Sequence, residues 1–193
     1  LATICLHSSR IAGPPALWIA PSTPPPPIRP EWAALTIASE YGHIEFVKLL
    51  IKTGANINAQ TKKGATAIMY ASGKGHIEVA EMLIEARADI NAQDKKKQTA
   101  LIVASQKGYT DFVKLLIEAG AEVNKQIIEG ITALMWALQE GHPDVARVLI
   151  AAGADVNAQD VHEQTALSWA SLDGQAEIVK LLIEESADVN AQS

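Results

Sequence analysis

The apolar positions of residues 62–94 follow the pattern of two short helices. Residues 67–71 place small apolar side chains on one face of a helix, and Thr66 is positioned to cap the start of that helix. Residues 73–75, Gly-Lys-Gly, interrupt the pattern. Residues 77–85 then carry a second apolar stripe, with glutamates on the side that faces water. We therefore predict a polar turn followed by a pair of helices.

The same pattern returns every 33 residues and fits five units without an insertion or deletion. A fixed period of this length is typical of stacked-repeat proteins. Helix pairs this short cannot bury their apolar faces alone, so we predict an all-α solenoid in which neighbouring units share one core. The asparagines that close the units recur at the same interval and are interpreted as loop-stabilising side chains. They are Asn58, Asn91, Asn124, Asn157 and Asn190.

These units resemble the ankyrin repeat. The resemblance rests on the Thr-x-Leu helix start, on Gly141-His142 before a second helix, and on the unit ending at 149–157. It implies helix-turn-helix units joined by β-turn fingers and stacked into a curved solenoid that binds other proteins on its concave face and finger tips. The resemblance covers about residues 30–193, with repeats at approximately 30–60, 63–93, 96–126, 129–159 and 162–192.

The units depart from the ankyrin pattern in two ways. The proline usual after the threonine is alanine in every unit, which we interpret as a more apolar packing of the first helices. Arg87 and Ser186 stand where three other units end their second helix with glycine. A side chain in that left-handed conformation costs roughly 1 kcal/mol, so we expect the second and fifth units to be weaker. Because the fifth unit keeps an interior-like helix, we expect the natural array to continue beyond this chain.

Residues 1–29 differ from the repeats. Eight of the nine prolines lie in the first thirty residues, and consecutive prolines favour an extended chain over helix or sheet. We predict a Pro-rich, disordered leader over residues 1–29 and a folded repeat domain over 30–193. A signal peptide is the alternative, because residues 11–20 are mostly apolar. Pro14 and Pro15 interrupt that stretch, however, and no basic segment precedes it.

The composition of the chain limits which classes of molecule it is expected to bind. The chain has 16 Lys and Arg against 22 Asp and Glu, a net charge of −6, which disfavours a nucleic-acid partner. No run approaches the roughly 18 apolar residues of a membrane-spanning helix, so no membrane insertion is expected. With Cys5 as the only cysteine, no internal disulfide can form. We expect an intracellular, reducing location in the cytoplasm.

The sequence contains no complete catalytic motif. His162-Glu163 begins like a metalloprotease helix, but Ala166 stands where the second histidine is required. Residues 73–75 lack the upstream glycine and the Ser or Thr of a phosphate-binding loop. We therefore predict a protein that is not an enzyme, with no cofactor and no small-molecule substrate. An enzyme within these residues would have His162 as its first candidate.

Three histidines recur at multiples of 33 residues, at His43, His76 and His142. The arrangement would permit a ladder of metal sites. We interpret these histidines as structural turn residues, because Tyr109 and Gln175 occupy the same position in the other units. No metal site is predicted.

The prediction of a binding surface rests on the side chains that differ from one unit to the next. In an ankyrin register, the finger tips and the ends of the first helices face the concave side. An aromatic pair lies in the first unit, a basic patch in the second and third, and an apolar and acidic strip in the fourth and fifth. Apolar turn tips and aromatic residues are frequent in binding sites. We predict partner contacts at Trp32, Tyr41, Lys62, Lys63, Lys74, Lys95, Lys96, Gln98, Lys107, Ile128, Ile131, Gln139, Val161, His162 and Leu172.

Two functions fit this surface. The first is a non-catalytic interaction module that docks a partner protein through the concave face and fingers. The alternative is a regulatory or targeting ankyrin segment of a longer enzyme, channel or effector, whose activity lies outside this chain.

Overall fold

The computed structural model describes residues 32–172 and 174–185, which form ten α-helices in five successive pairs. The all-α fold predicted from the sequence is confirmed, whereas the predicted leader over 1–29 lies outside the described residues. The helices are α1 (Trp32–Glu40), α2 (Ile44–Lys52), α3 (Ala67–Lys74), α4 (Ile77–Glu85), α5 (Ala100–Gln106), α6 (Thr110–Glu118), α7 (Ala133–Gln139), α8 (Pro143–Ala151), α9 (Ala166–Leu172) and α10 (Ala176–Glu184).

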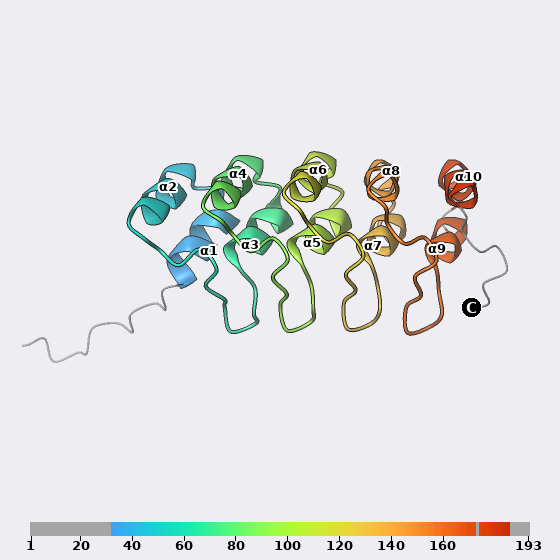
Figure 1. The fold of residues 1–193 in the computed structure, drawn as a ribbon, viewed down its shortest axis with the longest axis horizontal. Coiled ribbons are helices and arrows are strands. Elements are labelled where there is room, and N and C mark those ends of the chain that lie inside the picture. Colours follow the sequence, from blue (N-terminus) through green and yellow to red (C-terminus); the bar gives the residue numbers. More distant parts are fainter. Residues whose placement is uncertain (1–31, 173, 186–193) are drawn as a thin grey trace, which may run out of the picture.

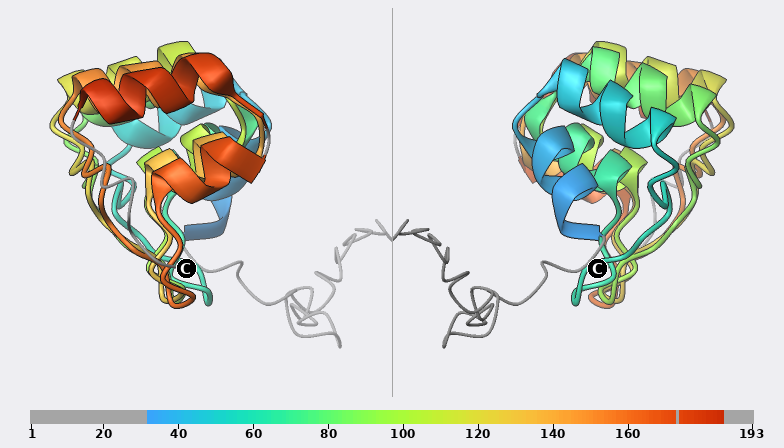
Figure 2. Two further views of the ribbon diagram at one scale, coloured as in Figure 1. Left: turned by 90° about the vertical axis from the view of Figure 1, so that its right-hand side faces the viewer. Right: turned by 90° about the vertical axis from the view of Figure 1, so that its left-hand side faces the viewer.

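The pairs stand side by side in two layers (Figure 1). The odd-numbered helices form one layer and the even-numbered helices the other, and each helix packs against its counterpart in the next pair. Four long loops join one pair to the next and project beyond the odd-numbered layer (Figures 1 and 2). We call these loops fingers; their tips are residues 61–65, 94–98, 127–131 and 160–164.

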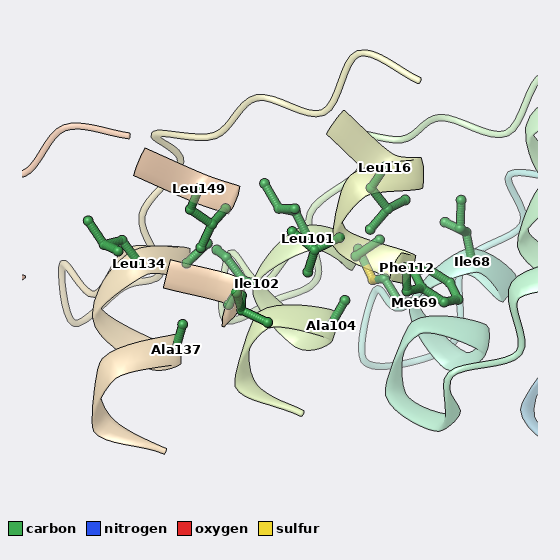
Figure 3. Close-up of a cluster of buried hydrophobic side chains, with 14 of the residues drawn as sticks. Ile68, Met69, Leu101, Ile102, Ala104, Phe112, Leu116, Leu134, Ala137 and Leu149 are labelled. Atoms are coloured by element: carbon green, nitrogen blue, oxygen red, sulfur yellow. The ribbon is translucent and has the colours of Figure 1, made fainter. Parts of the chain in front are cut away.

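The core runs without a break between the two layers (Figure 3). Small side chains such as Ala104 and Ala137 are fully buried and let the odd-numbered helices approach each other closely. Larger side chains, including Phe112 and Leu116 of α6, fill the space between the layers. The predicted shared core is therefore present across the units.

One local prediction for the second unit is wrong, and another is confirmed at a later residue of the predicted segment. The Thr66 side chain makes no capping hydrogen bond, although Thr99 and Thr132, at the same position of the next two units, cap α5 and α7. Their hydroxyl oxygens accept N–H groups three residues on, at 3.3 Å and 3.2 Å. Residues 73–75 do end α3 as predicted, but the helix continues through Gly73 and ends at Gly75, which adopts the left-handed conformation at φ 74°.

The recurring asparagines link neighbouring units. Asn124 donates from Nδ2 to the Gly153 carbonyl at 3.1 Å and accepts the Asp155 N–H at 2.8 Å. Asn58 and Asn91 each make the same two hydrogen bonds to the corresponding loop of the following repeat. The interpretation as loop-stabilising side chains is confirmed for these three residues.

The recurring histidines also connect units. The Nε2 atom of His76 lies 3.0 Å from the Glu40 carbonyl oxygen, and that of His142 lies 3.2 Å from the Gln106 carbonyl oxygen. A carbonyl oxygen only accepts, so Nε2 is the donor in both bonds. Gln175 donates in the same way to the Leu138 carbonyl at 3.0 Å. These contacts confirm the structural interpretation for His76 and His142.

Candidate partner-binding surface

Backbone hydrogen bonds hold the four finger tips in one row. The Lys95 N–H donates to the Lys63 carbonyl at 2.9 Å, and the Val161 N–H donates to the Glu129 carbonyl at 3.0 Å. The Ile128 N–H completes the series by donating to the Lys96 carbonyl at 3.2 Å. Each tip is thus fixed against the next, and the side chains on them keep their relative positions.

Each tip contains one residue in the left-handed conformation. Two of these residues are glycines, Gly64 and Gly130, whereas Lys97 and Glu163 adopt φ values of 62° and 60°. The two tips without glycine contain an aspartate three residues earlier. Asp94 Oδ1 accepts the N–H groups of residues 96 and 98 at 2.8 Å and 2.9 Å, and Asp160 does the same for 162 and 164. These hydrogen bonds stabilise the turn at the two tips where a residue other than glycine makes the left-handed conformation less favourable.

The predicted finger residues lie next to one another along this row. The lysines of the first two tips, at 62, 63, 95 and 96, are exposed. The next two tips present Ile128, which is 58% exposed, and Val161, which is 62% exposed. His162 is exposed beside Val161, with Glu129 and Glu163 also in solvent. The row is therefore basic at one end and apolar with acidic neighbours at the other.

The remaining predicted residues divide into two sets. Gln98 and Ile131 are half-buried, and Ile131 packs against the core, so neither is a freely exposed tip side chain. The side chain of Trp32 lies outside what the structure describes. Exposed side chains also stand at the C-terminal ends of the odd-numbered helices, at the other end of each helix from the finger that precedes it. They are Tyr41, Lys74, Lys107, Gln139 and Leu172.

An open hollow of about 190 Å³ lies between the second finger and helices α3 and α5. It is lined by Met69, Tyr70 and Val103 of the helices and by Asp94 and Gln98 of the finger. Of these, only Gln98 was predicted as a contact. The sequence does carry a signal at this position, because an aromatic residue recurs there as Tyr70, Trp136 and Trp169.

The described residues offer little for other chemistry. Among them, no group of three or more His, Cys, Asp or Glu side chains is placed to hold a metal ion. No described helix has the length and apolar character needed to cross a membrane.

Comparison with protein-family models decides the family. The model for ankyrin repeats (3 copies) matches residues 25–94 and 101–193, and the model for ankyrin repeats (many copies) matches residues 72–117. The chain belongs to the ankyrin repeat family. Ankyrin repeats are generally protein–protein interaction modules and are typically non-catalytic. No curated protein matches this ankyrin chain.

Proposed function

We propose that this ankyrin array binds a partner protein through the row of finger tips and the exposed side chains at the C-terminal ends of the odd-numbered helices. The observation that carries the proposal is the exposure of Ile128 and Val161 on adjacent tips that backbone hydrogen bonds hold together. Removing exposed apolar side chains from water lowers the free energy, so their burial under a partner protein favours binding. A row already held in place loses little conformational entropy on binding.

The charges along the row define the partner that fits. The lysines on the first two tips would pair with acidic groups of the partner. Ile128 and Val161 would contact apolar side chains further along it. Glu129 and Glu163 lie among the apolar tips, which disfavours a polyanion that follows the entire row. We therefore propose a protein segment with an acidic and an apolar part, bound without catalysis. The single cysteine of the chain supports a reducing, intracellular setting.

The same surface would serve a regulatory or targeting segment of a longer protein. In that case the binding proposed here remains the task of the repeats, and the activity it controls lies elsewhere.

Paired substitutions test the finger row. The variant Ile128→Ser with Val161→Ser removes both apolar tips without touching buried side chains. We expect the affinity for a partner captured from cell extract, and then purified, to fall by about tenfold or more. The control is Ile44→Ser with Ile77→Ser, which changes two partly exposed isoleucines at the starts of α2 and α4. This control should bind as the unchanged chain does; equal binding by the finger variant would overturn the proposal.

A further inference from the structure

The hollow beside the second finger lies where one recurring position of the odd-numbered helices carries its smallest side chain. The residues at this position, 33 apart and all half-buried, are Ile37, Tyr70, Val103, Trp136 and Trp169. Val103 is the smallest of them and lines the hollow together with Tyr70 of the preceding repeat. A tryptophan at residue 103 would occupy this space, and two later repeats accept tryptophan at the same position.

The size and the lining of the hollow fit one aromatic side chain. Its volume of about 190 Å³ is below the roughly 300–1,000 Å³ of small-molecule sites, so a single side chain fits better than a free ligand. Ala65, Met69 and Val103 make much of the lining apolar. The Tyr70 ring and the Met69 sulfur are groups that pack favourably against an aromatic ring. The hollow therefore favours an aromatic residue presented by another chain.

Lysines stand on both sides of the hollow. Lys74 and Lys107 follow Tyr70 and Val103 by four residues, so each lies about one helical turn beyond a lining residue. On the finger side, the first two tips carry five more, Lys62, Lys63, Lys95, Lys96 and Lys97. All seven are exposed, and no ion pair within the described residues includes any of them. Unpaired lysines in this concentration attract carboxylates.

The hollow also has one acidic lining residue, Asp94. Its Oδ1 atom accepts the N–H groups of residues 96 and 98 in its own finger, at 2.8 Å and 2.9 Å, so its charge is partly compensated there. The basic zone ends at the next repeat, where the exposed Glu140 stands at the position of Lys74 and Lys107 and the exposed Glu129 lies on the third tip. A long polyanion would meet both glutamates, whereas a short acidic segment over the second and third repeats would not.

We propose that the hollow takes one aromatic side chain of the partner, from a short segment that carries carboxylates on both sides of that residue. The aromatic ring packs against Tyr70 and Val103. The carboxylates pair with the lysines of the first two tips on one side and with Lys74 and Lys107 on the other. This inference rests on the proposed function, and it adds a second anchoring contact to the apolar tips of the third and fourth fingers.

A synthetic peptide tests the hollow in the full chain. The probe is a fluorescein-labelled peptide with one phenylalanine between two short runs of Asp and Glu, and fluorescence anisotropy measures its affinity. Val103→Trp fills the hollow with a residue that the fold accepts at 136 and 169, and it should lower the affinity by about tenfold or more. Ile37→Trp, the matched change outside the hollow, should bind the peptide as the unchanged chain does. Circular dichroism checks that both variants are folded.

A change in the peptide gives a second readout that leaves the protein intact. Replacing its phenylalanine by alanine should weaken binding to the unchanged chain by a similar factor. The same replacement should have little effect on binding to Val103→Trp, because the two changes remove the same contact. The proposal is overturned if the unchanged chain binds both peptides equally or does not bind the phenylalanine peptide. It is also overturned if Val103→Trp binds that peptide as tightly as the unchanged chain.

Paired charge changes test the lysines. Lys74→Glu with Lys107→Glu should weaken peptide binding by roughly two- to tenfold. Lys48→Glu with Lys52→Glu makes the same change in net charge on α2 and should have no such effect. Equal losses in the two pairs would mean a general attraction of charge and would overturn the assigned carboxylate contacts. An unlabelled oligothymidine that displaces the peptide as well as unlabelled peptide does would assign the lysines to a nucleic acid and would overturn the proposal.

The finger variant Ile128→Ser with Val161→Ser separates this inference from the proposed function. Because the peptide does not reach the third and fourth tips, this variant should bind it normally while it loses affinity for the captured partner. If the finger variant loses the partner but Val103→Trp keeps the peptide, only the hollow is wrong. If Val103→Trp loses the peptide but the finger variant keeps the partner, only the role of the apolar tips is wrong.

Discussion

Left-handed residues are the individual positions at which this sequence departs most from an ideal repeat. Gly54, Gly120 and Gly153 end the second helices of three repeats at φ values of 82° to 90°. Arg87 adopts φ 63° at the same position, as the sequence predicted. An arginine side chain is strained there, whereas glycine is not.

We predict that Arg87→Gly stabilises the array by about 0.5–1 kcal/mol, because relief of this strain exceeds the added freedom of glycine in the unfolded chain. Urea unfolding followed by circular dichroism measures the change. Arg87→Ala keeps a Cβ in the strained conformation and should give no comparable gain. A destabilised Arg87→Gly chain would contradict this explanation.

Single residues could be predicted only where their role repeats without change. Arg87 was predictable because three glycines mark its position. Lys97 and Glu163 were not, because their left-handed turns are supported by aspartates three residues away. Thr66 makes no capping hydrogen bond, although Thr99 and Thr132 make one at the same position of their repeats.

At the scale of elements, the loops between helix pairs carry bonds that fasten one repeat to the next. Asn124 makes two such bonds, to Gly153 and Asp155. By contrast, Asn56 accepts one hydrogen bond from Asn58, within its own loop.

We predict that Asn124→Ala lowers the free energy of unfolding by about 1–2 kcal/mol, because two inter-repeat hydrogen bonds are lost at once. Asn56→Ala, the control, should lose at most about 0.5–1 kcal/mol, since a single local bond is removed. Urea unfolding of both variants gives the comparison. Equal losses would mean that the link between repeats adds nothing beyond a local loop bond.

The helices and fingers were predicted almost completely, because their signals repeat five times at a fixed interval. The continuation of α3 through Gly73 concerns only where one helix ends. The hydrogen-bonded row of fingers could not be predicted, since it joins residues about 33 positions apart through backbone atoms that carry no sequence signal. The exposure of Ile128 was expected, whereas the partial burial of Ile131 depends on how its finger folds back onto the core.

At the scale of the whole molecule, position in the stack decides whether a side chain is buried. Phe46 and Phe112 occupy the same place in the first and third repeats, yet the first is 65% exposed and the second fully buried. The sequence pattern is the same at both, so the difference could not be predicted from the residues alone. It follows from the repeat that precedes Phe112.

We predict that Phe112→Ala destabilises the array by about 3–5 kcal/mol, because it leaves a cavity in the shared core. Phe46→Ala is the matched control and should change the unfolding free energy of the isolated chain by less than about 1 kcal/mol. Both are measured by urea unfolding. Similar losses in the two variants would show that the Phe46 side chain is buried in solution.

The central claim is that a partner protein binds on the row of fingers. Side-chain footprinting by hydroxyl radicals, with and without a captured and purified partner, tests it without any substitution. We predict that modification of Ile128, Val161 and His162 falls strongly in the complex, while modification of Ile44 and Ile77 stays unchanged. Protection confined to the even-numbered helices, with the finger tips modified as before, would contradict the claim.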